Sequence, residues 1–435
     1  VETQQRQERA VREPARQQRA DQPRRFPVRV RLPRVHRRQP HLRPVPDEQQ
    51  HERRVQPRAR QPGRVAHQVL RDLDDVDREA ARAVLRRAVR VHGVAGRDDG
   101  DRDAVALEPS LDLRAELGDA LASLAQRYRA TPMMGRTWMQ HALPITFGLK
   151  AAGWLDAVLR HQDRVALLGK RIRVVQFGGA SGSLASLGDQ GLAVAHALAH
   201  HLELELPSVP WHSHRDRIVE VATTLGLLTG TLGKIARDIS LQMQTEISEL
   251  SEPVIHGRGG SSTMPHKRNP VGCSAVLAAA VRVPGLVSTM LSSMLQEHER
   301  ALGGWQAEWD TLPQIAELAG AALTQLRTVI EGLQVDDARM RANIELTQGL
   351  VMAESVSLAL GRYVGRAAAH ELVESACAQA LKTSATLQDV LLADARITQH
   401  LSTETLAQLF DPAHYLGEAL ALTDRVLNDH RQRKA

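Results

Sequence analysis

Five aliphatic residues near the middle of the chain recur at alternating intervals of three and four residues. This alternation follows the period of an α-helix and places all five on one face, so it predicts a long helix within residues 218–250 that packs in a bundle. A second run repeats the pattern, and Pro284 inside it predicts a kink. The two runs are Leu225, Leu228, Leu232, Ile235 and Ile239, and Val276, Ala280, Val283, Val287, Met290 and Met294.

The rest of the chain also favours helices. Alternation of apolar and polar residues, which marks a strand, is almost absent, and Ser110 is a suitable N-cap for a helix with Leu117, Leu121, Leu124 and Tyr128 on one face. The 435-residue chain is 43% hydrophobic, enough for a large core. No window reaches about 18 uninterrupted apolar residues, so no membrane span is predicted. The expected fold is an all-α, long-helix bundle, and long apolar seams also suit burial between subunits.

The N-terminal region has a different composition. Residues 1–100 contain 25 Arg, no Lys and 14 acidic residues, whereas the remaining chain has 31 basic and 36 acidic residues. Nine of the twenty prolines lie within residues 1–62, and only residues 66–91 show a helical pattern of apolar positions. Three interpretations stay open: a solvated disordered tail, an artefactual translation from a shifted reading frame, or an arm that binds nucleic acid through phosphate contacts. The composition matches neither a transit peptide nor a secretory signal.

Cysteine usage limits the compartment and the metal chemistry. Cys273 and Cys377 are the only cysteines, which excludes a disulfide framework and favours the cytoplasm. No Cys/His spacing typical of zinc is present, so no metal site is predicted. No glycine-rich segment has the strand and helix context of a dinucleotide or P-loop site, so no nucleotide cofactor is predicted.

Residues 257–270 carry the densest chemistry. The segment Gly-Arg-Gly-Gly-Ser-Ser-Thr-Met-Pro-His-Lys-Arg-Asn-Pro predicts a mobile loop before a helix that begins near residue 272. Lys267 and Arg268 are suited to stabilise a carboxylate or a developing enediolate. Ser262 becomes a proton acceptor only if cations and backbone amides lower its pKa strongly. A surface loop with solvated charges is the alternative.

Three further segments supply polar groups. Residues 131–148 bring Arg136, Thr137, Gln140 and His141 close together in sequence, where His141 is either an acid, a carboxylate ligand or a structural histidine. The glycine-rich loop, residues 177–183, permits close backbone approach to an anion. Residues 212–217, His-Ser-His-Arg-Asp-Arg, lead into the long helix and suit its start.

Together these segments resemble the fumarase/aspartase/argininosuccinase superfamily of β-elimination lyases. The residues that carry the resemblance are Gly260–Pro270, Gly135–His141, Gln176–Leu184, Arg237–Leu241, Gln296–Arg300, Trp305 to Trp309, Leu346–Leu350 and Asp411–Gly417. The similarity spans about residues 110–430. Within the superfamily, Trp138 and Ser274 agree with the lactonising cycloisomerases, because adenylosuccinate lyases have a His and a Glu at these positions.

The resemblance implies a reaction and a set of site residues. It implies a reversible intramolecular addition and β-elimination on a small tricarboxylate, without metal or other cofactor. Ser262 matches the catalytic serine and His141 the histidine used as an acid, and which of them transfers the proton stays open. The implied substrate-binding residues are Ser261, Lys267, Asn269, Arg136, Thr137, Gln140, Ser181, Ser183 and Arg300.

The resemblance also implies a homotetramer with active sites shared between subunits, with neither membrane nor nucleic-acid partners. The expected organisation is an atypical Arg/Pro/Gln-rich region, disordered or misframed, over 1–109, a long-helix bundle domain over 110–345 and a small helical domain over 346–435. The family's Thr-Ser-Gln-Asp-like segment has no match in residues 60–110. The alternatives are therefore adenylosuccinate lyase, another β-elimination lyase of the superfamily, or an inactive helical homologue that lacks this substrate-binding segment.

Overall fold

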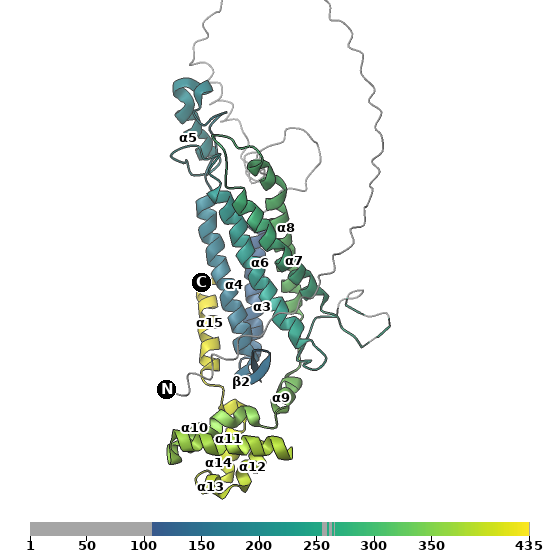
Figure 1. Cartoon of the computed structure of the whole chain (residues 1–435). Coiled ribbons are helices and arrows are strands. Elements are labelled where there is room, and N and C mark those ends of the chain that lie inside the picture. Colours follow the sequence, from purple (N-terminus) through teal and green to yellow (C-terminus); the bar gives the residue numbers. More distant parts are fainter. Residues whose placement is uncertain (1–106, 255–258, 261–262, 265, 435) are drawn as a thin grey trace, which may run out of the picture. The chain divides into compact units, whose positions relative to one another are not determined.

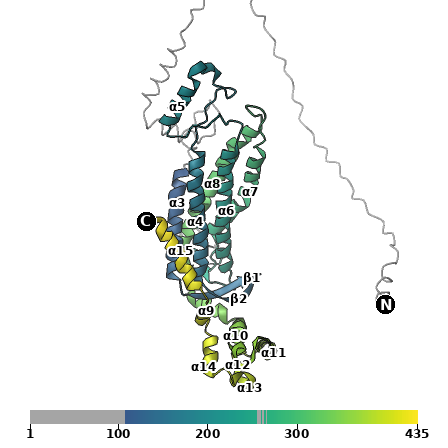
Figure 2. The same ribbon diagram turned by 90° about the vertical axis from the view of Figure 1, so that its left-hand side faces the viewer.

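The computed structural model describes residues 107–254, 259–260, 263–264 and 266–434. The Arg-rich region and the helix expected over 66–91 lie outside the described residues, as do Ser261 and Ser262. Five long helices lie side by side in this part of the chain (Figures 1 and 2): α3 (Leu107–Arg127), α4 (Phe147–Ile172), α6 (Asp216–Gln242), α7 (Val271–Ser292) and α8 (Gly304–Glu331). The predicted all-α bundle is confirmed.

The predicted apolar seam forms the core of the bundle. On α6, Leu225, Leu228, Leu232, Ile235 and Ile239 are all buried, and the last four pack in one cluster with residues of α3, α4, α7 and α8. The helix ends at Gln242, inside the predicted range. On α7, Val276, Val283 and Met290 are fully buried, whereas Ala280 and Val287 are half-buried. Met294 lies beyond the end of the helix and is 38% exposed, so the prediction is wrong for this residue. Pro284 lies inside the helix, and the kink expected there stays a prediction.

Two sequence predictions need correction. Helix α3 begins at Leu107, so Ser110 lies inside the helix and is not its N-cap. The sequence pattern also did not predict a β-hairpin, which consists of β1 (Pro132–Thr137) and β2 (Gln140–Thr146). These strands are short and mostly half-buried, so their sequences show no clear alternation of apolar and polar residues. The two strands pair antiparallel, and Thr146 then caps α4 by accepting a hydrogen bond from the amide of Leu149 at 3.0 Å.

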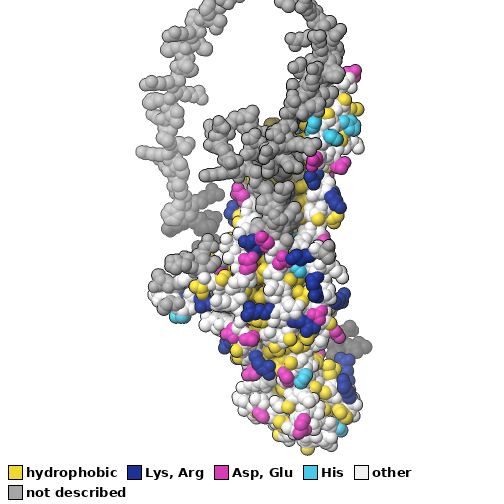
Figure 3. All heavy atoms as spheres, turned by 180° about the vertical axis from the view of Figure 1, so that it is seen from behind, with side chains coloured by type: hydrophobic (Ala, Val, Ile, Leu, Met, Phe, Trp, Pro, Cys, Tyr) yellow, Lys and Arg dark blue, Asp and Glu magenta, His cyan; other side chains and the backbone are white. Residues whose placement is uncertain are grey.

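Shorter elements extend both ends of the bundle. One end carries η1 (Ala185–Gln190) and α5 (Gly191–His201), where histidine side chains gather on the surface (Figure 3). The other end carries the hairpin, the ladder between β3 (Leu250–Ser251) and β4 (Gln334–Val335), and α9 (Asp337–Glu345).

A second hydrophobic core holds the C-terminal helices together. It is built from η2 (Leu350–Met352), α10 (Ala353–Val364), α11 (Arg366–Thr383), α12 (Leu387–Ala393), α13 (Ala395–Thr398) and α14 (Thr403–Leu409). After η3 (Pro412–His414), α15 (Ala419–Lys434) returns to pack on α3 and α4. The domain boundary between residues 345 and 346 stays a prediction.

Two bundle helices, α6 and α7, are long and apolar enough to cross a membrane. Core helices of soluble proteins have the same length and composition, so this is weak evidence for a span. In the apolar window of α6, 56% of residues are buried within the chain, but in that of α7 only 22% are. Helix α7 therefore has an apolar face that the described residues leave uncovered.

Candidate active site

The β-hairpin holds the first group of predicted site residues. Arg136 lies opposite His141 in the strand register, and Thr137 lies opposite Gln140. The turn between them consists of Trp138 and Met139, which both adopt left-handed backbone conformations with φ of 52° and 65°. A two-residue turn of this type matches the twist of the flanking strands but normally contains Asn or Gly. The hairpin therefore presents Thr137, Gln140 and a 96% exposed Trp138 to the surroundings.

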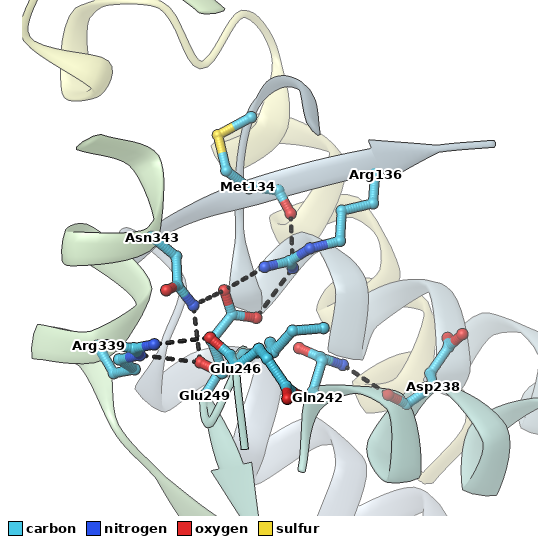
Figure 4. A network of polar contacts seen from close by, with 9 residues as sticks. Met134, Arg136, Asp238, Gln242, Glu246, Glu249, Arg339 and Asn343 are labelled. Carbon is cyan, nitrogen blue, oxygen red and sulfur yellow. Dashed lines mark hydrogen bonds and ion pairs between the residues drawn. The ribbon is translucent and has the colours of Figure 1, made fainter. Parts of the chain in front are cut away.

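An ion-pair network fixes the base of this hairpin (Figure 4). Arg136 Nη2 and Nη1 donate to the two carboxylate oxygens of Glu249 at 2.6 and 3.0 Å, and Nη1 also donates to the carbonyl of Met134 at 3.4 Å. Asn343 Nδ2 donates to Glu249 Oε1 at 2.9 Å. Arg339 donates to the carbonyls of Glu246 and Ile247 at 2.6 and 3.0 Å. The terminal nitrogens of Arg136 are thus engaged within the chain, which gives Arg136 a structural role beside the predicted one.

His141 lies half-buried beside this network. Its Nδ1 atom is buried and accepts or donates no hydrogen bond within the described residues. Burial and the Arg136 guanidinium lower the pKa of His141, and Glu249 opposes this shift only in part. The imidazole is therefore neutral near pH 7. Among the residues that the structure describes, no carboxylate forms a hydrogen bond with this imidazole.

The second group lies where loop 257–270 joins the bundle. A cavity of about 250 Å³ is lined by Lys267 and Asn269, together with Glu252, Pro253, Val254, Gly259, Gly260, Arg268, Val271, Gly272, Gln325, Thr328 and Val329. Within the described part of the loop, no side-chain hydrogen bond or ion pair engages Lys267. Arg268, by contrast, donates to Gln334 Oε1 at 2.7 Å. Helix α7 begins at Val271, close to the predicted start.

The glycine-rich loop forms the third group. Gly179 and Gly182 adopt positive φ values of 68° and 87°, which glycine adopts without steric cost. The close backbone approach to an anion stays a prediction. Arg300 donates to the carbonyls of Gly179 and Ala180 at 3.0 and 3.3 Å. A smaller cavity of about 170 Å³ is lined by Gln176, Gly179, Ala180, Ser181, Gly182, Pro210, His212, Ser213, His214, His298, Glu299 and Arg300. Ser183 is exposed but does not line it.

A buried ion pair lies next to this third group, and its Arg215 also donates to the carbonyl of His212, which lines the cavity. Arg215 donates to the carboxylate of Glu308 at 2.5 to 3.1 Å, with side-chain exposures of 7% and 0%. The Arg300 guanidinium lies over the ring of Trp305, which contacts His212 and Trp309 edge to face. Arg215 and Glu308 were not predicted as site residues, and only the charged start of α6 indicated that Arg215 would be structured.

The three groups do not meet within one chain. The 26-residue helix α4 begins directly after the hairpin and ends four residues before Gln176, so its ends are about 39 Å apart. Helix α7 likewise separates loop 257–270 from His298–Arg300 by 22 residues, or about 33 Å. The hairpin and the described residues 266–270 therefore lie at one end of the bundle, whereas Ser181, Ser183 and Arg300 lie at the other.

Sequence reasoning also missed two acidic residues near the first two groups. Glu249 binds Arg136, and Glu252 lies against the first turn of α7. The pattern Glu-Leu-Ser-Glu-Pro that contains them begins seven residues after the end of α6, but charge alone gives no sign of burial. Lys150, on the first turn of α4, was also missed. Its pKa is lowered by burial, while Asp238 acts in the opposite direction.

Comparison with known proteins places these features in a family. Residues 104–285 match the family model described as lyase, and residues 349–426 match the model described as adenylosuccinate lyase C-terminus. The 3-carboxy-cis,cis-muconate cycloisomerase of Pseudomonas aeruginosa is 55% identical over 314 residues, which cover 72% of this chain and 68% of the relative. That of Bradyrhizobium diazoefficiens is 49% identical over 73% of this chain and 71% of its own length.

Solved structures agree with this assignment. The crystal structure of the 3-carboxy-cis,cis-muconate lactonizing enzyme from Pseudomonas putida has a TM-score of 0.72 and 50% identity, covering 76% of this chain and 74% of that one. The β-carboxy-cis,cis-muconate cycloisomerase from Acinetobacter calcoaceticus has a TM-score of 0.70 and 44% identity, covering 74% and 73%. The chain therefore belongs to the lyase family of the fumarase/aspartase superfamily, as its loop and hairpin motifs predicted.

Proposed function

We propose that this chain catalyses the reversible lactonisation of 3-carboxy-cis,cis-muconate, the cycloisomerase step of protocatechuate breakdown in the β-ketoadipate pathway. The observation that carries the proposal is the identity of 49 to 55% with curated enzymes of this activity. Trp138 and Ser274 support it, since adenylosuccinate lyases have a His and a Glu at these positions. We further propose that the protein is cytoplasmic.

The proposed reaction defines what the site must provide. A carboxylate oxygen of the substrate adds to a double bond, and a proton is delivered to the neighbouring carbon. In the reverse direction, the proton is removed and the carboxylate leaves. The difficult species is a carbanion stabilised as an aci-carboxylate, which requires fixed cations and hydrogen-bond donors.

The loop and hairpin supply these groups. Lys267 and Asn269 line one cavity and are our candidates for holding the aci-carboxylate. Ser262 and His141 are our two candidates for proton transfer, and we assign Ser261 to substrate binding. A neutral His141 is suited to accept a proton, as the elimination direction requires. We assign Thr137, Gln140 and Arg136 to substrate binding at the hairpin.

We also propose a homotetramer whose active sites are shared between subunits. The separation of about 33 Å between the ends of α7 supports this, because no small tricarboxylate reaches Lys267 and Arg300 of one chain together. Antiparallel packing of two bundles would bring the glycine-rich loop of one chain, with Ser181, Ser183 and Arg300, to the hairpin end of another. The uncovered apolar face of α7 supplies a surface for that packing.

A parallel assay tests the reaction. The purified chain is incubated with 3-carboxy-cis,cis-muconate and, separately, with adenylosuccinate, and ultraviolet absorbance is followed in each. We expect loss of the muconate signal only, and a Lys267→Ala variant serves as the matched inactive control. Turnover of adenylosuccinate alone, or of neither compound, would contradict the proposal.

A further inference from the structure

Glu252 holds the first turn of helix α7. Its Oε2 accepts a hydrogen bond from the amide of Gly272 at 2.9 Å, and its Oε1 accepts one from the amide of Cys273 at 2.7 Å. These amides belong to the helix terminus, where donors lack partners within the helix and the dipole favours a negative charge. Glu252 comes from a different segment, 20 residues earlier in the chain, so it is a tertiary cap.

The segment that carries Glu252 also carries Glu249. These two residues flank the short strand β3, and Glu249 binds Arg136 of the hairpin. Residues 249–252 therefore contact both parts of the proposed site at this end of the bundle. One carboxylate fixes the hairpin and the other fixes the helix that follows loop 257–270.

The described end of the loop depends on this helix terminus. The amide of Asn269 donates to the carbonyl of Gly259 at 2.9 Å, and the amide of Val271 donates to the carbonyl of Asn269 at 2.9 Å. Asn269 is thus joined to the chain that enters the loop and to the residue that starts α7. A shift of the first turn of α7 would move Asn269 and Lys267 with it.

The fit around the cap is tight. A Cβ atom on Gly272 would lie 2.5 Å from Val329 Cγ2 and 3.3 to 3.4 Å from the two carboxylate oxygens of Glu252. Glu252 also lines the cavity that Lys267 and Asn269 line. Both of its oxygens accept from backbone amides, so its carboxylate is engaged in holding the helix and not in proton transfer.

We propose that Glu252 is a positioning residue for the lactonisation, which places Lys267 and Asn269 by anchoring the first turn of α7. This inference rests on the proposed function. A misplacement of about 1 Å in a substrate-binding group can cost on the order of 100-fold in rate. The anchor therefore acts on catalysis through the positions of Lys267 and Asn269.

Two variants of Glu252 and one control test the proposal. Glu252→Ala removes both hydrogen bonds, and Glu252→Gln retains one acceptor oxygen. The control is Thr386→Ala, which removes the cap of α12, where Thr386 Oγ1 accepts from the amide of Asp389 at 3.1 Å. Each full-length variant is compared by amide hydrogen exchange of peptides over residues 266–276 and 216–242, and by separate kcat and KM measurements.

We expect Glu252→Ala to exchange about tenfold faster over 266–276, with 216–242 unchanged, and to lose about 10- to 100-fold in kcat/KM. Glu252→Gln should lie between Glu252→Ala and the wild type, and Thr386→Ala should change neither quantity. The proposal would be overturned if Glu252→Ala exchanged over residues 266–276 at the wild-type rate. It would also be overturned if Glu252→Ala had the same kcat/KM as the Thr386→Ala control. The exchange experiment needs no substrate. If the wild-type chain shows no turnover, that result therefore counts against the proposed function alone. The exchange rates still show whether Glu252 anchors the first turn of α7.

Discussion

Arg136 and Glu249 lie 113 positions apart in the chain, and both carboxylate oxygens of Glu249 accept hydrogen bonds from the Arg136 guanidinium. The Glu249 side chain is fully buried and that of Arg136 is 19% exposed. Asn343 provides a third hydrogen bond from α9. The pair therefore joins the hairpin, the segment after α6 and α9, and it holds the strand that carries Arg136 opposite the one that carries His141.

Removing Glu249 should destabilise the fold strongly. Glu249→Ala leaves the Arg136 guanidinium without its partner in a mostly buried position, and breaking a buried pair in this way costs about 3–5 kcal/mol. Glu246→Ala is the matched control, because Glu246 is exposed and only its backbone carbonyl is used by Arg339. Surface changes of this kind stay within about 0.5 kcal/mol. Urea unfolding measures both, and equal midpoints would show that the pair adds nothing to stability.

The sequence predicted the bundle because burial of a helix face leaves a periodic trace. Leu225 to Ile239 on α6 form such a trace, and every member is buried. The hairpin left none, since its strands are short and mostly half-buried, and its turn is Trp138-Met139 in place of the usual Asn-Gly. Short strands with one covered face do not alternate cleanly enough to be recognised.

The sequence predicted individual residues of the candidate site, but it did not predict how they are arranged in space. Lys267, Asn269 and His141 were identified through motifs, and the structure places them at one end of the bundle. Glu249 and Glu252 were not identified, because nothing in their local sequence shows that they meet Arg136 and the α7 terminus. Contacts between segments far apart in the chain depend on tertiary packing, which a single sequence does not encode in its periodicity.

His141 should titrate below its ordinary pKa. Burial and Arg136 favour the neutral imidazole, so the pKa in the folded chain lies below 6.5. The unfolded chain then takes up the proton first, and the stabilising contribution of His141 is present above pH 6.5 and is lost as the pH falls through the folded pKa. An NMR titration of the His141 ring measures the midpoint directly. Arg136→Met removes the guanidinium that lowers the pKa of His141, so this variant should titrate at a higher pH than the wild type. A wild-type midpoint above pH 6.5 would contradict the assignment of a neutral imidazole.

The exposed face of α7 should be an interface between copies of this chain. Val281 is 78% exposed on α7, and Val271 and Leu291 of the same helix are exposed as well. Several exposed large aliphatic residues on one helix are typical of an interaction surface. Val281→Asp places a charge on this face and should shift the protein to smaller species in light scattering coupled to size-exclusion chromatography. Leu381→Asp is the control, since Leu381 is 70% exposed on α11, outside the bundle. An unchanged mass for Val281→Asp would remove α7 from the proposed interface.

Two inactive variants should restore activity when they are mixed. Lys267→Ala and Arg300→Ala change opposite ends of α7, and each alone should lose most activity because every site then lacks one group. If a site takes Lys267 from one subunit and Arg300 from another, refolding the two variants together in equal amounts leaves about one quarter of the sites intact. If both residues came from the same chain, no mixed site would be complete. Turnover of 3-carboxy-cis,cis-muconate by the mixture, measured against each variant refolded alone, separates the two arrangements. The Lys267→Ala/Arg300→Ala double variant mixed with wild type provides the internal check, because shared sites again give about one quarter and unshared sites give about one half.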